Sequence, residues 1–321
     1  MKKYLSILVL FLASFSATAQ PATVNAAKKL YEENKPADAK RLLTPIADDS
    51  KEYPAAQFLL GRITFDEKKY EDAADFFEQA VDANDKVAEY HYWHGAAMGS
   101  EAQVSGMIRK GILAPKIKTA FEKTVALDPK HMPAMEGLVQ YYLQAPSMMG
   151  GDKAKALEMA NKMKAVDKGR GHMQVANVYM AEKKTDLAEK EYLELIKHDP
   201  NKWDYQVALG NFYLGTKQVQ RAVDFYEAKL KKNPGDMPAT YQLGKVAAVA
   251  GVQLDRGEAC LKAYLKTQPA KDAPQPANAY HRLGMIYEKK NNKAEAKKCY
   301  ETALKLDPAI AGVKELLAKL Q

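Results

Sequence analysis

The 321-residue chain has the composition of an ordinary globular protein, with 47% hydrophobic and 27% charged residues. This is too apolar for a disordered chain, and a mean hydropathy of −0.44 is too low for a protein with many membrane spans. Two cysteines cannot supply a disulfide framework for a chain of this length. The formal net charge of +8 comes largely from scattered lysine pairs, which are typical of solvated helix faces.

The N-terminus has the three parts of a secretory signal peptide. Lys2 and Lys3 precede an apolar run from Leu5 to Phe15, and small residues ending at Ala19 follow it. The run of about 11 residues is shorter than the ~20 that a membrane-spanning helix needs. We therefore predict a signal peptide over residues 1–19 that is cleaved after Ala19, no transmembrane span in the mature chain, and a periplasmic or secreted location.

A pattern with a period of 34 residues recurs along the rest of the chain. In each of three segments an Ala precedes a Tyr by four residues and a Pro by twelve: Ala188, Tyr192 and Pro200; Ala222, Tyr226 and Pro234; Ala296, Tyr300 and Pro308. Leu-Gly pairs lie upstream, at Leu60-Gly61, Leu209-Gly210, Leu243-Gly244 and Leu283-Gly284. Small residues at fixed places let two helices approach closely, aromatic side chains fill the space beside them, and Pro ends the second helix.

This pattern resembles the tetratricopeptide repeat, a helix–turn–helix unit of 34 residues. The resemblance implies an all-α fold, a right-handed α-solenoid of about eight helical hairpins with a C-terminal capping helix. The expected units lie near residues 20–53, 54–87, 88–131, 132–168, 169–202, 203–236, 237–276 and 277–310, and the capping helix over 309–321.

Some of the units depart from the pattern. The first has Ala39 and Leu43 in the Ala and aromatic places, and the seventh has Arg256 and Cys260 there, followed by a Pro-rich exit. The fourth carries an extra loop at 145–151, in which glycines turn the chain and Asp152 caps the next helix. The third is ten residues too long, and the apolar spacing in its excess predicts a short amphipathic helix that packs onto the solenoid or docks a partner: Val104, Met107, Ile108, Ile112 and Leu113.

No catalytic motif is present in the sequence. His91 and His94 lie three residues apart and could face one metal, but they occupy repeat positions that normally pack against the neighbouring helix, and a catalytic zinc needs three protein ligands. Cys260 and Cys299 occupy aromatic-type positions, so we expect small buried side chains rather than a disulfide. We predict no catalytic, cofactor or metal site, and a protein that is not an enzyme.

The resemblance implies a binding groove lined by the first helix of each unit. Its polar and aromatic positions here are Arg62, Tyr92, Trp93, Gln140, Arg170, Gln174, Asn177, Asn211, Tyr241, Lys245, His281 and Arg282. The family's clamp for a C-terminal carboxylate is matched in part by Asn177, Asn211, Lys245 and Arg282. Met173 stands where the first clamp lysine is expected, so the clamp is not reproduced.

These observations predict a non-catalytic scaffold or adaptor of the cell envelope that binds an extended segment of a protein partner in this groove. The alternative is binding of an acidic envelope polymer or membrane surface through the lysine-rich outer face. A third interpretation is a solvated groove that binds no ligand. We expect no nucleic-acid partner, and the sequence does not fix the oligomeric state.

Overall fold

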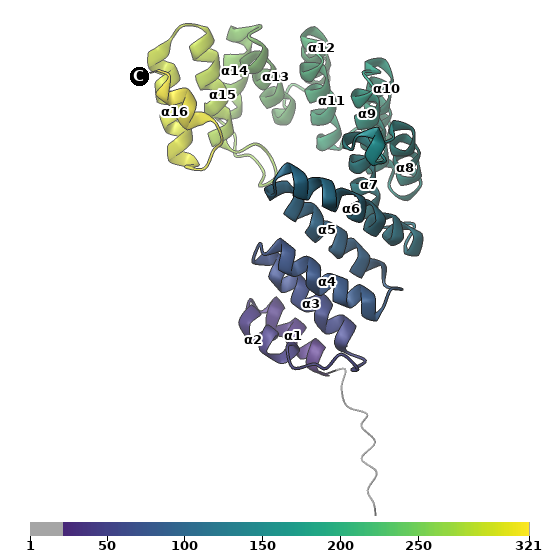
Figure 1. Cartoon of the computed structure of the whole chain (residues 1–321). Coiled ribbons are helices and arrows are strands. Elements are labelled where there is room, and N and C mark those ends of the chain that lie inside the picture. Colours follow the sequence, from purple (N-terminus) through teal and green to yellow (C-terminus); the bar gives the residue numbers. More distant parts are fainter. Residues whose placement is uncertain (1–21, 321) are drawn as a thin grey trace, which may run out of the picture. The chain divides into compact units, whose positions relative to one another are not determined.

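The computed structural model describes residues 22–320, and the chain divides into two compact units that meet in the sequence at Val166 and Asp167. Unit 1 contains α1–α8 and unit 2 contains α9–α17 (Figure 1). The predicted signal peptide falls on residues that lie outside this description. None of the described helices is long and apolar enough to cross a membrane.

Residues 22–320 form an all-helical fold in which consecutive α-helices pack as antiparallel pairs. The helices of unit 1 are α1 (Ala22–Glu32), α2 (Pro36–Leu43), α3 (Tyr53–Asp66), α4 (Tyr70–Ala83), α5 (Ala88–Val104), α6 (Met107–Leu127), α7 (Met132–Gln144), the 3-10 helix η1 (Ser147–Met149) and α8 (Lys153–Val166). Those of unit 2 are α9 (Lys168–Ala181), α10 (Thr185–His198), α11 (Trp203–Gly215), α12 (Val219–Lys232), α13 (Met237–Ala250), α14 (Leu254–Tyr264), α15 (Pro276–Lys289), α16 (Lys293–Leu306) and α17 (Val313–Ala318). The predicted all-α solenoid of helical hairpins is confirmed.

The core of a regular hairpin is built on a glycine of the first helix and an aromatic ring of the second. A Cβ added at Gly284 would lie 2.3 Å from the Tyr300 ring, and one at Gly61 would lie 2.6 Å from Phe77. Both rings are completely buried. The sequence pattern therefore exists because only glycine lets the two helices approach across the ring.

Three second helices, α10, α12 and α16, end at an Asp or Asn that is followed by proline. Asp199, Asn233 and Asp307 adopt extended backbone angles, as a residue before proline must when its helical conformation clashes with the proline ring. In all three, the side-chain oxygen accepts a hydrogen bond from the backbone N–H two residues later, at 3.0–3.1 Å. This turn redirects the chain into the next hairpin.

The turn inside five of the hairpins has one non-glycine residue in the left-handed region. These residues are Asn34, Lys68, Lys183, Lys217 and Asn291, with φ between 58° and 63°. In each, the following N–H bonds back to a carbonyl five residues earlier, which satisfies the end of the first helix. The lysines were not recognisable as turn residues from the sequence, because lysine has no preference for this conformation.

The seventh hairpin has a longer turn than the others, which corrects the expected alignment of its second helix. Gly251 and Gln253 both have positive φ, so α14 begins one residue later than the 34-residue period predicts. Gly257, rather than Arg256, faces Ala247, and Leu261, rather than Cys260, packs against Gly244. Cys260 and Cys299 are both buried free thiols, as predicted.

The excess residues of the third hairpin form no separate helix, and of the five apolar residues predicted to pack onto the solenoid only Leu113 does so. The excess residues instead lengthen both helices, so that α5 has 17 residues and α6 has 21. Of the apolar residues in this extension, Leu113 is buried, whereas Val104, Met107, Ile108 and Ile112 are exposed. The loop before α8 does behave as expected, because Asp152 Oδ1 accepts hydrogen bonds from the N–H groups of residues 154 and 155.

Candidate functional site

The first candidate site is a pocket of about 650 Å³ in unit 1, here named the α5–α7 pocket. Its walls come from α5, α6 and α7: Tyr92, Ala96, Gly99, Ser100, Ala102, Gln103, Lys110, Ala114, Ile117, Phe121, Pro133, Glu136, Gly137, Gln140, Tyr141, Gln144 and Ala145. The extension of α5 supplies the small residues, which leave the space open. Part of its wall, at Gln103 and Lys110, comes from the residues by which this hairpin exceeds its neighbours.

Next to this pocket, two predicted groove residues, Arg62 and Trp93, stack against each other. The Arg62 guanidinium of α3 lies 3.7 Å from the centre of the Trp93 ring of α5. Trp93 Nε1 donates a hydrogen bond to Glu89 at 2.8 Å, and its ring meets Phe65 edge-on. This stacking holds α3 and α5 together.

The second candidate site is a pocket of about 330 Å³ in unit 2, here named the α11–α15 pocket. It is lined by residues of α11, α13, α15 and the loop before α15: Trp203, Asp204, Val207, Tyr241, Gln242, Lys245, Asp272, Ala273, Pro274, Asn278 and Arg282. Three first helices of successive hairpins thus contribute to one hollow. The predicted groove residues Tyr241, Lys245 and Arg282 meet here.

Two cations of the α11–α15 pocket have no carboxylate partner. Lys245 Nζ donates to Asn211 Oδ1 at 2.8 Å and makes no ion pair with any described residue. Arg282 has a buried Nε without a hydrogen-bond partner, and one terminal N–H contacts the sulfur of Met285. Burial, reinforced by the charge of Arg282, lowers the pKa of Lys245 below its ordinary value. Asp204 and Asp272 line the same pocket but pair with neither cation.

The loop between α14 and α15 forms one wall of this pocket. Tyr264 donates a hydrogen bond to the Pro274 carbonyl at 2.6 Å. Gln275 Nε2 donates to the carbonyls of Ala270 and Ala273 at 3.0 and 2.8 Å. These bonds hold the loop against the end of α14, so the wall is fixed before any ligand arrives.

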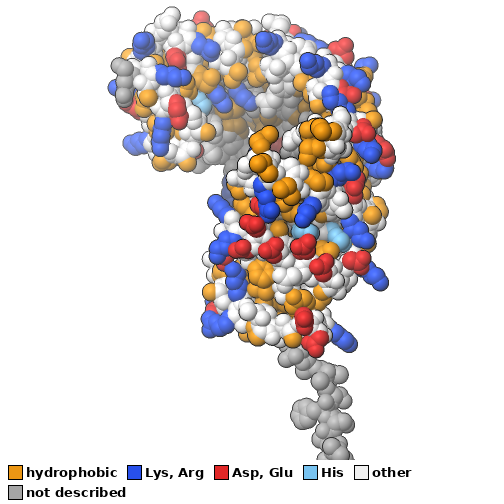
Figure 2. Space-filling model, viewed as in Figure 1, with side chains coloured by type: hydrophobic (Ala, Val, Ile, Leu, Met, Phe, Trp, Pro, Cys, Tyr) orange, Lys and Arg blue, Asp and Glu red, His pale blue; other side chains and the backbone are white. Residues whose placement is uncertain are grey.

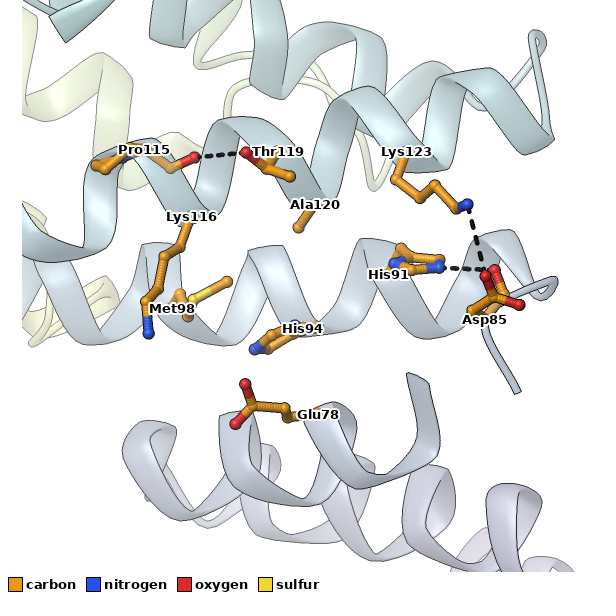
Figure 3. Close-up of a pocket in the computed structure, with 10 residues that line it drawn as sticks. All are labelled: Glu78, Asp85, His91, His94, Met98, Pro115, Lys116, Thr119, Ala120 and Lys123. Atoms are coloured by element: carbon orange, nitrogen blue, oxygen red, sulfur yellow. Dashed lines mark hydrogen bonds and ion pairs between the residues drawn. The ribbon is translucent and has the colours of Figure 1, made fainter. Parts of the chain in front are cut away.

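A third pocket, of about 560 Å³, lies between α4, α5 and α6 and contains the two histidines considered as metal ligands (Figure 3). His91 is buried, and its Nε2 donates to the Asp85 carbonyl at 2.9 Å. His94 points toward Glu78, and burial lowers the pKa of its imidazole. Within residues 22–320 no group of three His, Cys, Asp or Glu side chains is placed to hold a metal. Packing is the role that the geometry gives to His91.

Models of the tetratricopeptide repeat family match residues 24–88, 175–237 and 277–310, about half of the chain. The chain is a tetratricopeptide repeat protein. Its fold is similar to that of a tetratricopeptide repeat protein from Parabacteroides merdae, with a TM-score of 0.57 and 16% identity over 93% of this chain and 96% of that one. A repeat protein fragment from Cytophaga hutchinsonii is similar over 91% of this chain and 98% of its own, with a TM-score of 0.48 and 14% identity. At 16% identity the likeness to the Parabacteroides merdae protein shows the fold alone.

One named relative is similar over part of its length. A stretch of 103 residues, 32% of this chain, is 31% identical to the tetratricopeptide repeat and J domain-containing co-chaperone of Cryptococcus neoformans. The match spans 20% of that protein.

The tetratricopeptide repeats bring some of the predicted groove residues together and leave others apart. Tyr92 and Gln140 line the α5–α7 pocket, and Asn211 holds Lys245 at the α11–α15 pocket. Arg170, Gln174 and Asn177 lie on α9 and line neither pocket, and Asn177 donates to Gln174 at 3.4 Å. His281 packs against the Tyr300 ring, and burial together with Arg282 lowers its pKa to about 4.

Sequence reasoning missed Trp203, Val207 and the loop residues 272–274 of the α11–α15 pocket. Trp203 is the first residue of its helix and lies outside the positions that the family pattern supplied. Val207 occupies the same repeat position as Tyr241, 34 residues later, but was not among the residues selected from that pattern. The loop carried a signal that could have found it. Its prolines lengthen the seventh unit beyond 34 residues, and excess residues in a repeat protein gather at one face, which is often the binding face.

Proposed function

We propose that this tetratricopeptide repeat protein is a non-catalytic scaffold that binds an extended segment of a partner protein, with a carboxylate of that segment in the α11–α15 pocket. The observation that carries the proposal is the pair Lys245 and Arg282, two cations in one pocket without an acidic partner among the described residues. A half-buried charge without a counter-charge costs stability, and a ligand carboxylate supplies what is missing.

The surroundings of the cations suit an extended segment. Trp203, Val207 and Pro274 offer apolar surface beside the charged end of the pocket. Asn278 and Gln242 can donate to and accept from a peptide backbone. A carboxylate next to an apolar side chain in the partner therefore matches both parts of the pocket.

We further propose that the protein acts outside the cytoplasm, in the cell envelope or as a secreted protein. The support is the sequence of residues 1–19, with its lysines, apolar run and small residues. The similarity to a co-chaperone over 103 residues agrees with a repeat region that holds segments of other proteins. A general attraction of acidic polymers to the outer lysines has no comparable pocket in its favour.

The test is a peptide array probed with the chain from Gln20 onward, using short peptides that each end in a free carboxylate or in an amide. The strongest binder is then measured by fluorescence anisotropy. Removing its carboxylate, or changing Lys245→Met or Arg282→Met, should weaken binding by about tenfold to a hundredfold, because charge-assisted hydrogen bonds are lost. Lys232→Met removes an exposed lysine of α12 and is the matched control, which should bind like the wild type.

Folding and binding can be separated in this experiment. Lys245→Met removes a half-buried charge beside Arg282, so its thermal midpoint should not fall. Equal affinity for amidated and free peptides, or unchanged affinity in both pocket variants, would show that the pocket does not bind a carboxylate.

A further inference from the structure

The free end of the α5–α6 hairpin exposes four large apolar side chains, here named the apolar tip: Val104, Met107, Ile108 and Ile112. Met107 and Ile108 are each 84% exposed, Val104 is 76% exposed and Ile112 is 52% exposed. Figure 2 shows hydrophobic side chains gathered over the part of unit 1 where α5 and α6 lie. Side chains this exposed contribute little to the core, so the fold gives no reason for them.

We propose that the apolar tip inserts into the surface of an anionic phospholipid bilayer. The chemistry around the tip indicates this partner. Between Ala102 and Phe121 the sequence contains Arg109, Lys110, Lys116 and Lys118 and no acidic residue. Apolar side chains flanked by cations are the combination that binds an interface of acyl chains and negatively charged headgroups.

The cations available to the headgroups are Lys110 and Lys116. Both are exposed, and neither forms an ion pair with a described residue. Lys118 is paired with Glu122 at 3.4 Å, and Arg109 is paired with Glu101 and Glu71 at 2.5 and 3.0 Å. Arg109 thereby neutralises the nearby acids, which would otherwise repel an anionic surface.

The spacing along α6 puts the apolar and basic groups at different depths. Ile108, Ile112 and Lys116 are four residues apart and share one face of the helix. Eight residues of helix raise Lys116 about 12 Å above Ile108. A tip that enters the headgroup and acyl boundary by about 5–10 Å therefore brings Lys116 to the level of the phosphates.

The tip is held rigidly enough to enter a bilayer as a unit. Arg109 connects the first turn of α6 to α5 through Glu101 and to α4 through Glu71. Leu113 is buried and joins the core cluster of this part of unit 1. The four apolar side chains are therefore presented by a formed hairpin and need no refolding.

A second copy of the chain is a less suitable partner. Tip-to-tip pairing of two copies would bring Lys110 and Lys116 close to the same residues of the other copy, and no exposed acid within residues 102–121 offsets them. Like charges at such an interface cost affinity. An anionic bilayer meets both the apolar and the basic groups.

The experiment is co-sedimentation of the chain from Gln20 onward with two kinds of vesicle, pure phosphatidylcholine and phosphatidylcholine with about one-third phosphatidylglycerol. This chain contains every described helix and lacks the apolar run at residues 5–15. We expect the chain to bind the anionic vesicles, and we expect this binding to weaken as the salt concentration rises. Met107→Asp and Ile108→Asp should each lower the partition coefficient at least tenfold. The double variant Lys110→Glu with Lys116→Glu should lower it by about 25-fold or more, since each of the two lost cations contributes about fivefold.

Met148→Asp is the matched control. Met148 is 94% exposed, lies in the same unit and undergoes the same substitution as Met107. It should bind vesicles like the wild type. Equal loss in Met148→Asp, full retention in Met107→Asp and Ile108→Asp, or no binding of the wild type to anionic vesicles would each overturn the proposal. Self-association that depends on Ile108, without vesicle binding, would identify a second copy as the partner instead.

This proposal is independent of the α11–α15 pocket. Lys245→Met and Arg282→Met should leave vesicle binding unchanged, and Met107→Asp should leave peptide affinity in the α11–α15 pocket unchanged. Each proposal can therefore fail without the other.

Discussion

The α15–α16 hairpin and the α5–α6 hairpin use glycine in opposite ways. In α15, Gly284 is required because the Tyr300 ring lies where a side chain would start. In the extension of α5 and α6, Gly99, Gly106 and Gly111 have no atom within 4 Å of an added Cβ. The regular hairpin packs its glycine against a buried ring, whereas the extension of α5 and α6 leaves its glycines and four large apolar side chains exposed or without close neighbours.

The same contrast applies to the seventh hairpin. Its first helix keeps the regular contact of Gly244 with the second helix, while the long loop that follows it forms a wall of the α11–α15 pocket. Both candidate pockets thus depend on residues that exceed the 34-residue repeat. The repeats supply the framework, and the excess residues supply the features that distinguish this chain from others with the same fold.

Among the substitutions that test this comparison, Gly284→Ala should change the free energy of unfolding most. The added methyl group would overlap the buried Tyr300 ring, so we expect the free energy of unfolding of the chain to fall by about 2–3 kcal/mol. Denaturant unfolding followed by circular dichroism measures it. A fall smaller than that caused by an average surface substitution would contradict the close packing described for regular hairpins.

The pH dependence of stability should show the effect of burying His281 beside Arg282. Burial and Arg282 lower the pKa of His281 from 6.5 to about 4 in the folded chain, so the unfolded chain binds the proton more readily. The free energy of unfolding that depends on a neutral His281 is therefore fully present above pH 6.5 and is lost as the pH falls toward about 4. After allowance for partial solvent exposure we expect about 1–2 kcal/mol.

The measurement for His281 is the free energy of unfolding at pH 7 and near pH 4, compared between wild type and His281→Gln. The neutral glutamine should make the protein less sensitive to acid than the wild type. Identical pH profiles would mean that His281 titrates as freely in the folded chain as in the unfolded one.

Gly111→Ala gives the smallest effect and the opposite sign to Gly284→Ala. Gly111 lies inside α6 with open space around it, so alanine should raise the free energy of unfolding by about 0.5–1 kcal/mol through helix propensity alone. The same denaturant titration measures it. If Gly111→Ala lowered the free energy of unfolding instead, another group would have to lie against α6 at this position. That would contradict the open space described around Gly111.

The hairpin fold was predictable from the sequence because packing fixes its residues. Leu-Gly, the alanines and the aromatic rings must recur wherever two helices approach closely, and Pro200, Pro234 and Pro308 mark the ends of α10, α12 and α16. The register of α14 was not predictable, because the extra residue in its turn changes no residue of the pattern around Leu243-Gly244. Only the contact of Gly257 with Ala247 reveals the shift.

The pockets were predictable only in part. Lys245, Tyr241 and Arg282 followed from repeat positions, but the wall formed by Pro274 depends on a hydrogen bond from Tyr264, which lies on another helix and has no signature in the sequence. The tip of α5–α6 was misjudged because apolar spacing indicates which residues share a helix face. It does not indicate whether that face is covered.

The two buried cysteines make the chain suitable for site-specific labelling. Burial raises the pKa of both thiols, that of Cys299 to about 11, so neither forms the reactive thiolate at neutral pH. The sequence contains no other cysteine. A single cysteine introduced on the surface would therefore react with a maleimide dye far faster than Cys260 or Cys299, and the native chain needs no prior removal of its own thiols.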